Sequence, residues 1–147
     1  MSVKPIPEGY HTITPLLLVK DAAKLIDFII HAFNGKQKSR HDGPDGTVMH
    51  AEVMIGDSLI MLGEANEKFP SMPGTLYLYV NDVDSIYKQA LLAGGTSLRE
   101  PTTEFYGDRS SGVTDSFGNH WWIATHVEDV SPEEMERRQE EFFKKQN

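Results

Sequence analysis

Two short stretches of the chain gather side chains that could do chemistry. His50 and Glu52 lie two residues apart in VMHAEVMI, so on a β-strand they would share a face. There they could act as a base and the group that orients it, or simply satisfy one another as a polar pair. In DSFGNHWWIAT, His120 precedes the chain's two tryptophans, Trp121 and Trp122. Adjacent strand residues point to opposite faces, so one tryptophan should face a core and the other something else.

Arg109, in the stretch FYGDR, is a candidate for binding an anion. On a loop that closes over a cavity, its guanidinium group could hold a carboxylate through two parallel hydrogen bonds. The alternative is an ion pair with Asp108 that braces the loop.

The elements that must position these side chains repeat along the chain. VKDAAKL at 19–25 matches VNDVDSI at 80–86, with an offset of 61. IGDSLIM at 55–61 matches FGNHWWI at 117–123, with an offset of 62. Each half predicts a strand, a helix and three more strands. We therefore predict an α+β fold of two βαβββ modules, residues 10–64 and 74–126, in one domain of residues 1–147.

Local signals predict where several elements begin and end. The first strand of each module is predicted at residues 12–19 and 75–80, and Asp21 and Asp82 are predicted to cap the helices that follow. Residues 101–108 are predicted to connect strands. SPEE, with proline at the first helical position, predicts a further helix over residues 131–143.

The alternation of side chains assigns each strand two faces. Uniformly apolar sets, such as Met49, Ala51, Val53 and Ile55, should face the helices. The mixed sets share the opposite face and comprise Thr14, His50, Glu52, Thr75, Tyr77, His120 and Trp122. Small-molecule cavities have this aromatic and amphipathic character, although a dimer interface or a sheet face partly exposed to solvent would have the same composition.

Composition excludes several classes of function. The net charge of −8, with no basic cluster, argues against a nucleic-acid partner. No apolar stretch is long enough to span a membrane, and the first residues lack the apolar region of a signal peptide, so we expect a cytoplasmic protein. The absence of cysteine excludes disulfides and thiolate metal sites.

The duplicated unit and its motifs resemble the vicinal oxygen chelate superfamily, which contains glyoxalase I, the bleomycin-resistance proteins and the extradiol dioxygenases. The PhnB-like branch is the most similar, through VMHAE, GDSLIML, YGDR and the tryptophan-rich last strand. The resemblance implies two βαβββ modules that form a cupped mixed sheet (the glyoxalase/bleomycin-resistance fold), a small-molecule ligand, and a homodimer that is often intertwined.

Metal enzymes of this superfamily hold a divalent cation through His, Gln or Glu. The matching positions here carry Thr14, Ile60, Thr75 and Trp122, and none suits such a cation. The resemblance therefore implies a protein that binds a small molecule without a metal or other cofactor. Its ligand site would comprise Thr14, Thr75, Tyr77, Arg109, His120 and Trp122.

Two alternatives stay open, so the sequence leaves undecided whether the protein is an enzyme. One is a glyoxalase-like lyase or dioxygenase in which His50, Glu52 and His120 hold zinc, nickel, iron or manganese at a displaced site. His50 and Glu52 would then be the catalytic residues. The other is a non-catalytic dimer whose cupped face is filled by its own side chains.

Overall fold

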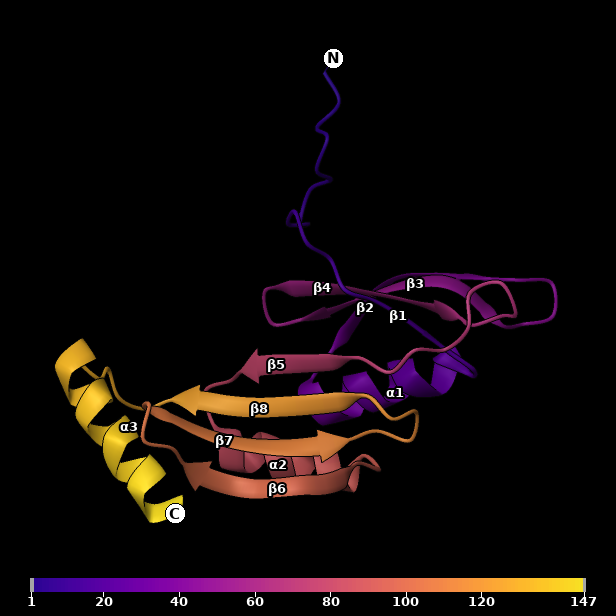
Figure 1. The fold of residues 1–147 in the computed structure, drawn as a ribbon. Coiled ribbons are helices and arrows are strands. Elements are labelled where there is room, and N and C mark those ends of the chain that lie inside the picture. The colour runs from indigo at the N-terminus through magenta and orange to yellow at the C-terminus, as the bar shows by residue number, and fades with distance from the viewer. Residues whose placement is uncertain (1, 147) are drawn as a thin grey trace.

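The fold consists of two modules with the same order of elements, followed by a helix (Figure 1). The computed structural model describes residues 2–146. The first module comprises β1 (Leu16–Val19), α1 (Ala22–Phe33), β2 (Lys36–Asp42), β3 (Val48–Ile55) and β4 (Ser58–Glu64). The second comprises β5 (Thr75–Tyr79), α2 (Val83–Leu92), β6 (Thr96–Thr103), β7 (Asp108–Thr114) and β8 (His120–His126), and α3 (Pro132–Gln146) ends the chain. The predicted α+β fold of two βαβββ modules with a C-terminal helix is confirmed.

Each module forms one mixed four-stranded sheet, in the orders β1-β4-β3-β2 and β5-β8-β7-β6. The first strand of each module runs parallel to the last, and the other pairs are antiparallel. Leu16 pairs with Met61 in the first sheet, and Tyr77 pairs with Trp122 in the second. Met61 is therefore the structural counterpart of Trp122.

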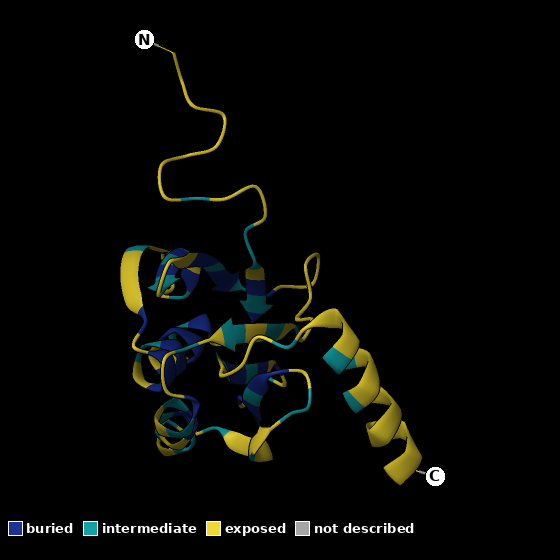
Figure 2. Ribbon diagram, turned by 90° about the vertical axis from the view of Figure 1, so that its left-hand side faces the viewer, coloured by how far each residue is buried: buried dark blue, intermediate teal, exposed yellow. Residues whose placement is uncertain are grey.

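The two helices lie on the inner faces of the sheets, and α1 fills the angle between them (Figures 1 and 2). Trp121 of β8 is fully buried, and its ring centroid lies 5.0 Å from that of Phe33 and 6.4 Å from that of Phe28, both on α1. The Trp121 indole N–H donates to Asp115 at 2.8 Å. One core therefore joins both modules. Among the described residues, no helix has the length and apolar character needed to cross a bilayer.

The two predicted helix caps have different outcomes. Asp82 caps α2 as predicted, because its carboxylate accepts from the backbone N–H of Ser85 at 3.2 Å. The prediction for Asp21 is wrong, because this residue has a left-handed backbone (φ 72°) and its side chain makes no capping bond. The Glu64 carboxylate at the end of β4 accepts instead from the backbone N–H groups of Asp21 (2.7 Å) and Ala22 (3.1 Å).

Three strand details differ from the predictions. β1 begins at Leu16 rather than at residue 12, and Ile13 is 85% exposed. In β3 the pairing with β2 shifts between residues 48 and 50, which makes Met49 the extra residue of a bulge. Met49 is therefore 65% exposed, whereas Val48 is buried. Part of the predicted connection at 101–108 is strand, because β6 continues to Thr103.

Candidate functional site

The candidate site lies on the outer face of the second sheet, which the helices leave open. Trp122 of β8 lies on this face between Tyr77 of β5 and Gly112 of β7. Its ring lies directly over Gly112, where an added Cβ would be only 2.5 Å from the indole Cζ3 atom. The guanidinium group of Arg99 from β6 lies 5.2 Å from the ring centroid, within the range of a cation–π contact. The sheet therefore presents a flat, half-buried indole beside a cation.

Arg99 is held in place by polar neighbours on the same face. Its Nη2 donates to the Ser110 hydroxyl, and its Nη1 lies 3.5 Å from a carboxylate oxygen of Glu104. Ser110 is fully buried, whereas the Arg99 side chain remains 42% exposed. Part of the guanidinium group is thus available to a ligand that lies against Trp122.

A buried carboxylate lies toward one end of this face. Asp108 is 5% exposed, and one of its oxygens accepts from the hydroxyls of Tyr77 (3.0 Å) and Tyr79 (2.9 Å). Its other oxygen lies 2.9 Å from Nδ1 of His126, whose Nε2 lies 2.7 Å from Asp129. The two tyrosine rings, with centroids 5.3 Å apart, are therefore fixed as a pair.

These contacts shift the pKa values of the cluster. Burial alone would raise the pKa of Asp108, but the hydrogen bonds from His126, Tyr79 and Tyr77 outweigh it and hold this pKa below its usual value. The hydrogen bond to Asp108, followed by that to Asp129, raises the pKa of His126. Burial, followed by the hydrogen bond to Asp108, raises the pKa of Tyr77. The tyrosines thus remain neutral donors at neutral pH, which keeps the cluster rigid.

The other end of the face is more open. His120 and Thr75 are exposed and are directly paired across β8 and β5. Predicted site residues Thr75, Tyr77, His120 and Trp122 are therefore brought together on one sheet face.

His50 and Glu52 lie on β3, in the first sheet, with His50 Nε2 3.5 Å from Glu52 Oε1. The Tyr10 hydroxyl is buried next to Glu52, although it makes no hydrogen bond of normal geometry with the residues the structure describes. Burial, and then the nearby Glu52, raise the pKa of Tyr10 to about 12. The Tyr10 hydroxyl is in turn the main cause that lowers the pKa of Glu52, with a smaller contribution from His50. This pair belongs to a different sheet from Trp122.

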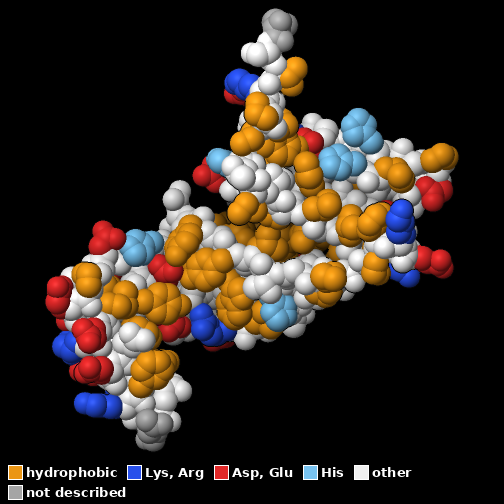
Figure 3. All heavy atoms as spheres, turned by 45° about the horizontal axis from the view of Figure 1, so that its top comes forward, with side chains coloured by type: hydrophobic (Ala, Val, Ile, Leu, Met, Phe, Trp, Pro, Cys, Tyr) orange, Lys and Arg blue, Asp and Glu red, His pale blue; other side chains and the backbone are white. Residues whose placement is uncertain are grey.

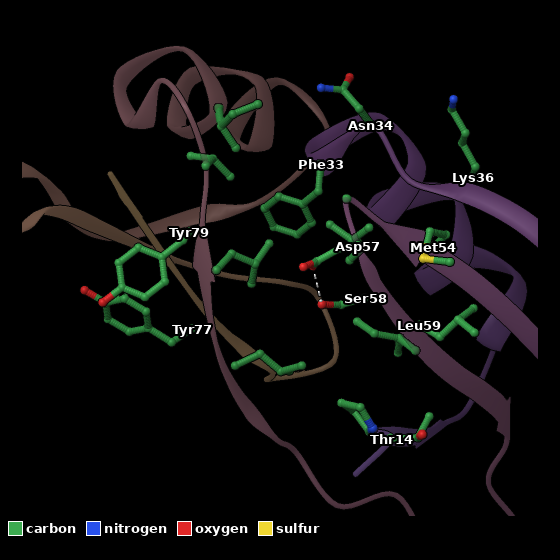
Figure 4. A pocket seen from close by; sticks show the side chains of 18 of the residues that line it. Thr14, Phe33, Asn34, Lys36, Met54, Asp57, Ser58, Leu59, Tyr77 and Tyr79 are labelled. Atoms are coloured by element: carbon green, nitrogen blue, oxygen red, sulfur yellow. Dashed lines mark hydrogen bonds between the residues drawn. The ribbon is translucent and has the colours of Figure 1, made fainter. Parts of the chain in front are cut away.

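A groove of about 1360 Å³ runs between the two modules, along β5 on one side and the β3–β4 turn on the other (Figure 4). Its lining includes the predicted residues Thr14, Thr75 and Tyr77. Figure 4 shows the rings of Tyr77 and Tyr79 together beside β5, across from Asp57, Ser58 and Leu59. Hydrophobic side chains gather along the hollow in the middle of the surface shown in Figure 3.

Arg109 does not reach this face, so its predicted role as a ligand-binding loop residue is wrong. It is the second residue of β7 and points to the helix side, where Nε and Nη2 donate to the two carboxylate oxygens of Asp84 on α2, each at 2.9 Å. The alternative, a brace between Arg109 and Asp108, also fails, because these strand neighbours point to opposite faces.

The residues present do not fit the metal that the superfamily's enzymes use. The positions that correspond to ligands carry the hydroxyls of Thr14 and Thr75, the Trp122 indole, and Ile60, with Met61 as the true counterpart of Trp122. His120 lies on a different sheet from His50 and Glu52. Among residues 2–146, no three His, Cys, Asp or Glu side chains are grouped so that they could hold a metal ion.

Several residues of this face were not predicted. Arg99, Ser110 and Gly112 reach it only through the pairing of β6 and β7, which a single sequence does not reveal. Tyr79 could have been predicted on this face, because it lies two residues after Tyr77 on the same strand.

Comparisons with known proteins agree with this fold. The sequence profile of the Glyoxalase/Bleomycin resistance protein/Dioxygenase superfamily matches residues 10–123. The chain belongs to this superfamily. Uncharacterized proteins of Mycobacterium bovis and Mycobacterium tuberculosis are 35% identical to the chain over 138 residues, which is 84% of this chain and 89% and 79% of theirs.

Solved structures with this fold include TioX from Micromonospora sp. ML1, with a TM-score of 0.67 and 20% identity over 78% of this chain and 99% of that one. A PhnB protein from Bacillus cereus, described as a putative 3-demethylubiquinone-9 3-methyltransferase, has a TM-score of 0.63 and 19% identity over 78% of this chain and 99% of that one. These likenesses establish the fold, and a PhnB protein is among its structural neighbours.

Proposed function

We propose that this superfamily member binds a small molecule against the outer face of the second sheet, without a metal. The observation that carries the proposal is the Trp122 indole, which lies flat over Gly112 with the Arg99 guanidinium group beside it. A planar ligand can stack on an indole, and a guanidinium group recognises a carboxylate. Arg99 thus takes the anion-binding role that the sequence suggested for Arg109.

The ligand class that fits best is a planar molecule with an anionic group. Trp122 and Tyr77 would supply apolar contact area, and Arg99 would pair with the anion. His120 and Thr75, at the open end, would offer further hydrogen-bonding groups. Most of these side chains are fixed by their strand neighbours or by hydrogen bonds, so little conformational entropy would be lost on binding.

Tryptophan fluorescence tests this proposal, because the two tryptophans differ in exposure. Titration with small aromatic carboxylates should change the emission of the wild type and of Trp121→Phe, which keeps Trp122. The same titration should leave Trp122→Phe unchanged, because Trp121 is fully buried. An equal response in Trp122→Phe would place the ligand elsewhere.

Metal analysis tests the metal-independent part of the proposal. Protein purified without a histidine tag should contain far less than one equivalent of zinc, nickel, iron or manganese. One tightly bound equivalent, lost in His50→Ala or Glu52→Ala, would instead favour a lyase or dioxygenase with a displaced site.

We also propose that the protein forms a homodimer. The support is that β1 and β5 end their sheets with unpaired edges, which proteins commonly cover. Light scattering at micromolar concentration should give twice the mass of 16.5 kDa, and a monomer would contradict the proposal.

A further inference from the structure

Glu104 lies beside Arg99 on the outer face of the second sheet, where its carboxylate can contact a ligand. One carboxylate oxygen of Glu104 lies 3.5 Å from Arg99 Nη1. Charge-assisted bonds between such groups are usually about 2.7–2.9 Å long. The Glu104 side chain is also 18% exposed. The contact is therefore loose, and both charged groups keep the capacity to bond to a third molecule.

A tight turn holds Glu104 in this position. Its backbone N–H donates to the Asp108 carbonyl at 2.7 Å, and its own carbonyl accepts from the Gly107 N–H at 3.2 Å. Gly107 completes the turn with a positive φ of 101°, and an added Cβ at this position would collide with the Glu128 carbonyl oxygen. The turn therefore depends on glycine and has little freedom to carry Glu104 away from Arg99.

Helix α3 supports the same turn from outside (Figure 1). The Phe142 ring centroid lies 4.9 Å from that of Phe105, the residue that directly follows Glu104. Arg138 Nη1 donates to the Phe105 carbonyl at 3.1 Å, and the Arg138 guanidinium group also bonds to both carboxylate oxygens of Glu128. The Glu104 carboxylate is thus held near Arg99 by contacts on both sides of the turn.

The charge of Glu104 restricts which anions Arg99 can hold well. A ligand that brings only a carboxylate to Arg99 also brings it close to the Glu104 carboxylate, and like charges repel at such short range. A ligand that brings a carboxylate and an ammonium group avoids this repulsion. Its carboxylate pairs with Arg99, and its ammonium group pairs with Glu104.

We propose that Arg99 and Glu104 together recognise an α-amino-acid group, on a ligand whose aromatic ring stacks on Trp122. This inference rests on the proposed function, because it names the ligand class of the same face. In an α-amino acid one carbon carries both charged groups, so they can pair with two protein groups that lie side by side. The Arg99 guanidinium group lies 5.2 Å from the Trp122 ring centroid, so a ring on a short side chain reaches the indole.

The equivalent positions of the first sheet carry a different set of side chains. Ser39 pairs with Glu52 across β2 and β3, as Arg99 pairs with Gly112 across β6 and β7. In the first sheet a hydroxyl therefore replaces the guanidinium group, and a carboxylate side chain stands where Gly112 makes room for the indole. The proposed recognition is thus specific to the second module.

Three ligands that differ by single groups test the proposal. They are L-phenylalanine, 3-phenylpropionate, which lacks the ammonium group, and 2-phenylethylamine, which lacks the carboxylate. The emission of Trp122 in Trp121→Phe reports binding, and isothermal titration calorimetry of the wild type provides a second measurement. L-phenylalanine should have a dissociation constant about tenfold lower than that of either analogue. Binding of 3-phenylpropionate as tight as that of L-phenylalanine would overturn the proposal.

Charge-neutral variants test the two protein groups separately. In Glu104→Gln the preference for L-phenylalanine over 3-phenylpropionate should fall to within about twofold, because the amide neither attracts the ammonium group nor repels a lone carboxylate. Glu100→Gln removes the same charge from an exposed position of β6 and should keep the wild-type preference. Arg99→Gln should bind 2-phenylethylamine more tightly than 3-phenylpropionate. Equal preferences in the wild type and Glu104→Gln would contradict the role of Glu104.

The outcomes also separate this inference from the proposed function. If L-phenylalanine and 3-phenylpropionate change the emission of Trp122 with equal dissociation constants, the ligand site at Trp122 stands and the recognition of an amino-acid group fails. If none of the three ligands changes that emission or releases heat in calorimetry, both proposals fail together.

Discussion

At the scale of single residues, Gly112 decides how closely Trp122 lies against the second sheet. A methyl group at position 112 would meet the indole Cζ3 atom at 2.5 Å. The alternation in NHWWIA correctly places Trp121 in the core and Trp122 outside. The surface that the indole rests on was not predictable, because it depends on the pairing between β7 and β8.

Gly112→Ala should therefore destabilise the protein and move the indole. Overpacking of this kind costs about 1–3 kcal/mol of unfolding free energy. Urea denaturation measures the loss, and a shift in the emission of Trp122 should accompany it. Gly112→Ala in a Trp122→Leu background should cost much less, because the clashing ring is gone. An equal cost in both backgrounds would show that the ring does not oppose the methyl group.

Arg109 shows how the start of a strand changes a functional prediction. Residues 101–108 were predicted as a connection, so Arg109 was free to lie over a cavity. In the structure β7 begins at Asp108, and strand alternation then sends Asp108 outward and Arg109 toward α2. Arg99, which does reach the candidate site, carries no local sequence signal.

At the scale of elements, a strand from the far end of the first module caps α1. Two backbone N–H groups at the start of this helix donate to the Glu64 carboxylate. The sequence predicted Asp21 as the cap, because aspartate is among the residues preferred immediately before a helix. Only the packing of β4 beside β1 brings Glu64 to the same place, so the true cap was not predictable.

Glu64→Ala should lower the unfolding free energy by about 1–2 kcal/mol, because both backbone donors lose their acceptor. Asp21→Ala should cost less, because its side chain makes no capping bond. Urea denaturation followed by circular dichroism compares the two variants. A larger loss in Asp21→Ala would mean that the sequence-based cap is the correct one.

His126 connects Asp108 of β7 with Asp129, which precedes α3. The stabilisation that these contacts provide should depend on pH. The pKa of this side chain lies above its ordinary value of 6.5 because it bonds to Asp108 and then Asp129. Since the folded pKa exceeds the unfolded one, the stabilisation is fully present below about pH 6.5 and is lost as pH rises through the raised folded pKa. The lowered pKa of Asp108 acts in the opposite sense, so its contribution is lost only as pH falls below about 3.8.

Wild type should therefore exceed His126→Gln in unfolding free energy between about pH 4 and 6.5, and the difference should shrink at higher pH. Urea denaturation from pH 5 to 9 measures it. Asp129→Asn should shift the same transition to lower pH, because one of the two carboxylates is removed. A difference that is constant across this range would contradict the role of His126.

At the scale of the whole molecule, one core holds both modules together. Phe28 and Phe33 of the first module pack directly against Trp121 of the second. The repeat, the order of elements and the sheet faces could be read from apolar periodicity, because those patterns are local. The angle between the two sheets, which also shapes the groove, could not be read from the sequence. It depends on contacts such as that of Phe33 with Trp121, which lie far apart along the chain.

The two modules should therefore unfold together. Trp121 fluorescence, measured in a Trp122→Phe background, and far-ultraviolet circular dichroism should give one coincident urea transition. Phe33→Ala should move both signals equally and cost about 3–5 kcal/mol, because it leaves a cavity at the junction. Two separate transitions would show that the modules are independent.

The position of Trp121 also has a consequence for how the protein is made. Synthesis proceeds from the N-terminus, so α1 leaves the ribosome long before Trp121, one of the residues that cover its apolar face. During that interval Phe28 and Phe33 lack their contacts with Trp121. In each sheet the first strand pairs with the last, so it can pair only after the last strand has been made. Such long-range contacts form slowly. Until β8 emerges, a newly made chain thus exposes apolar surface of α1 through which it could aggregate.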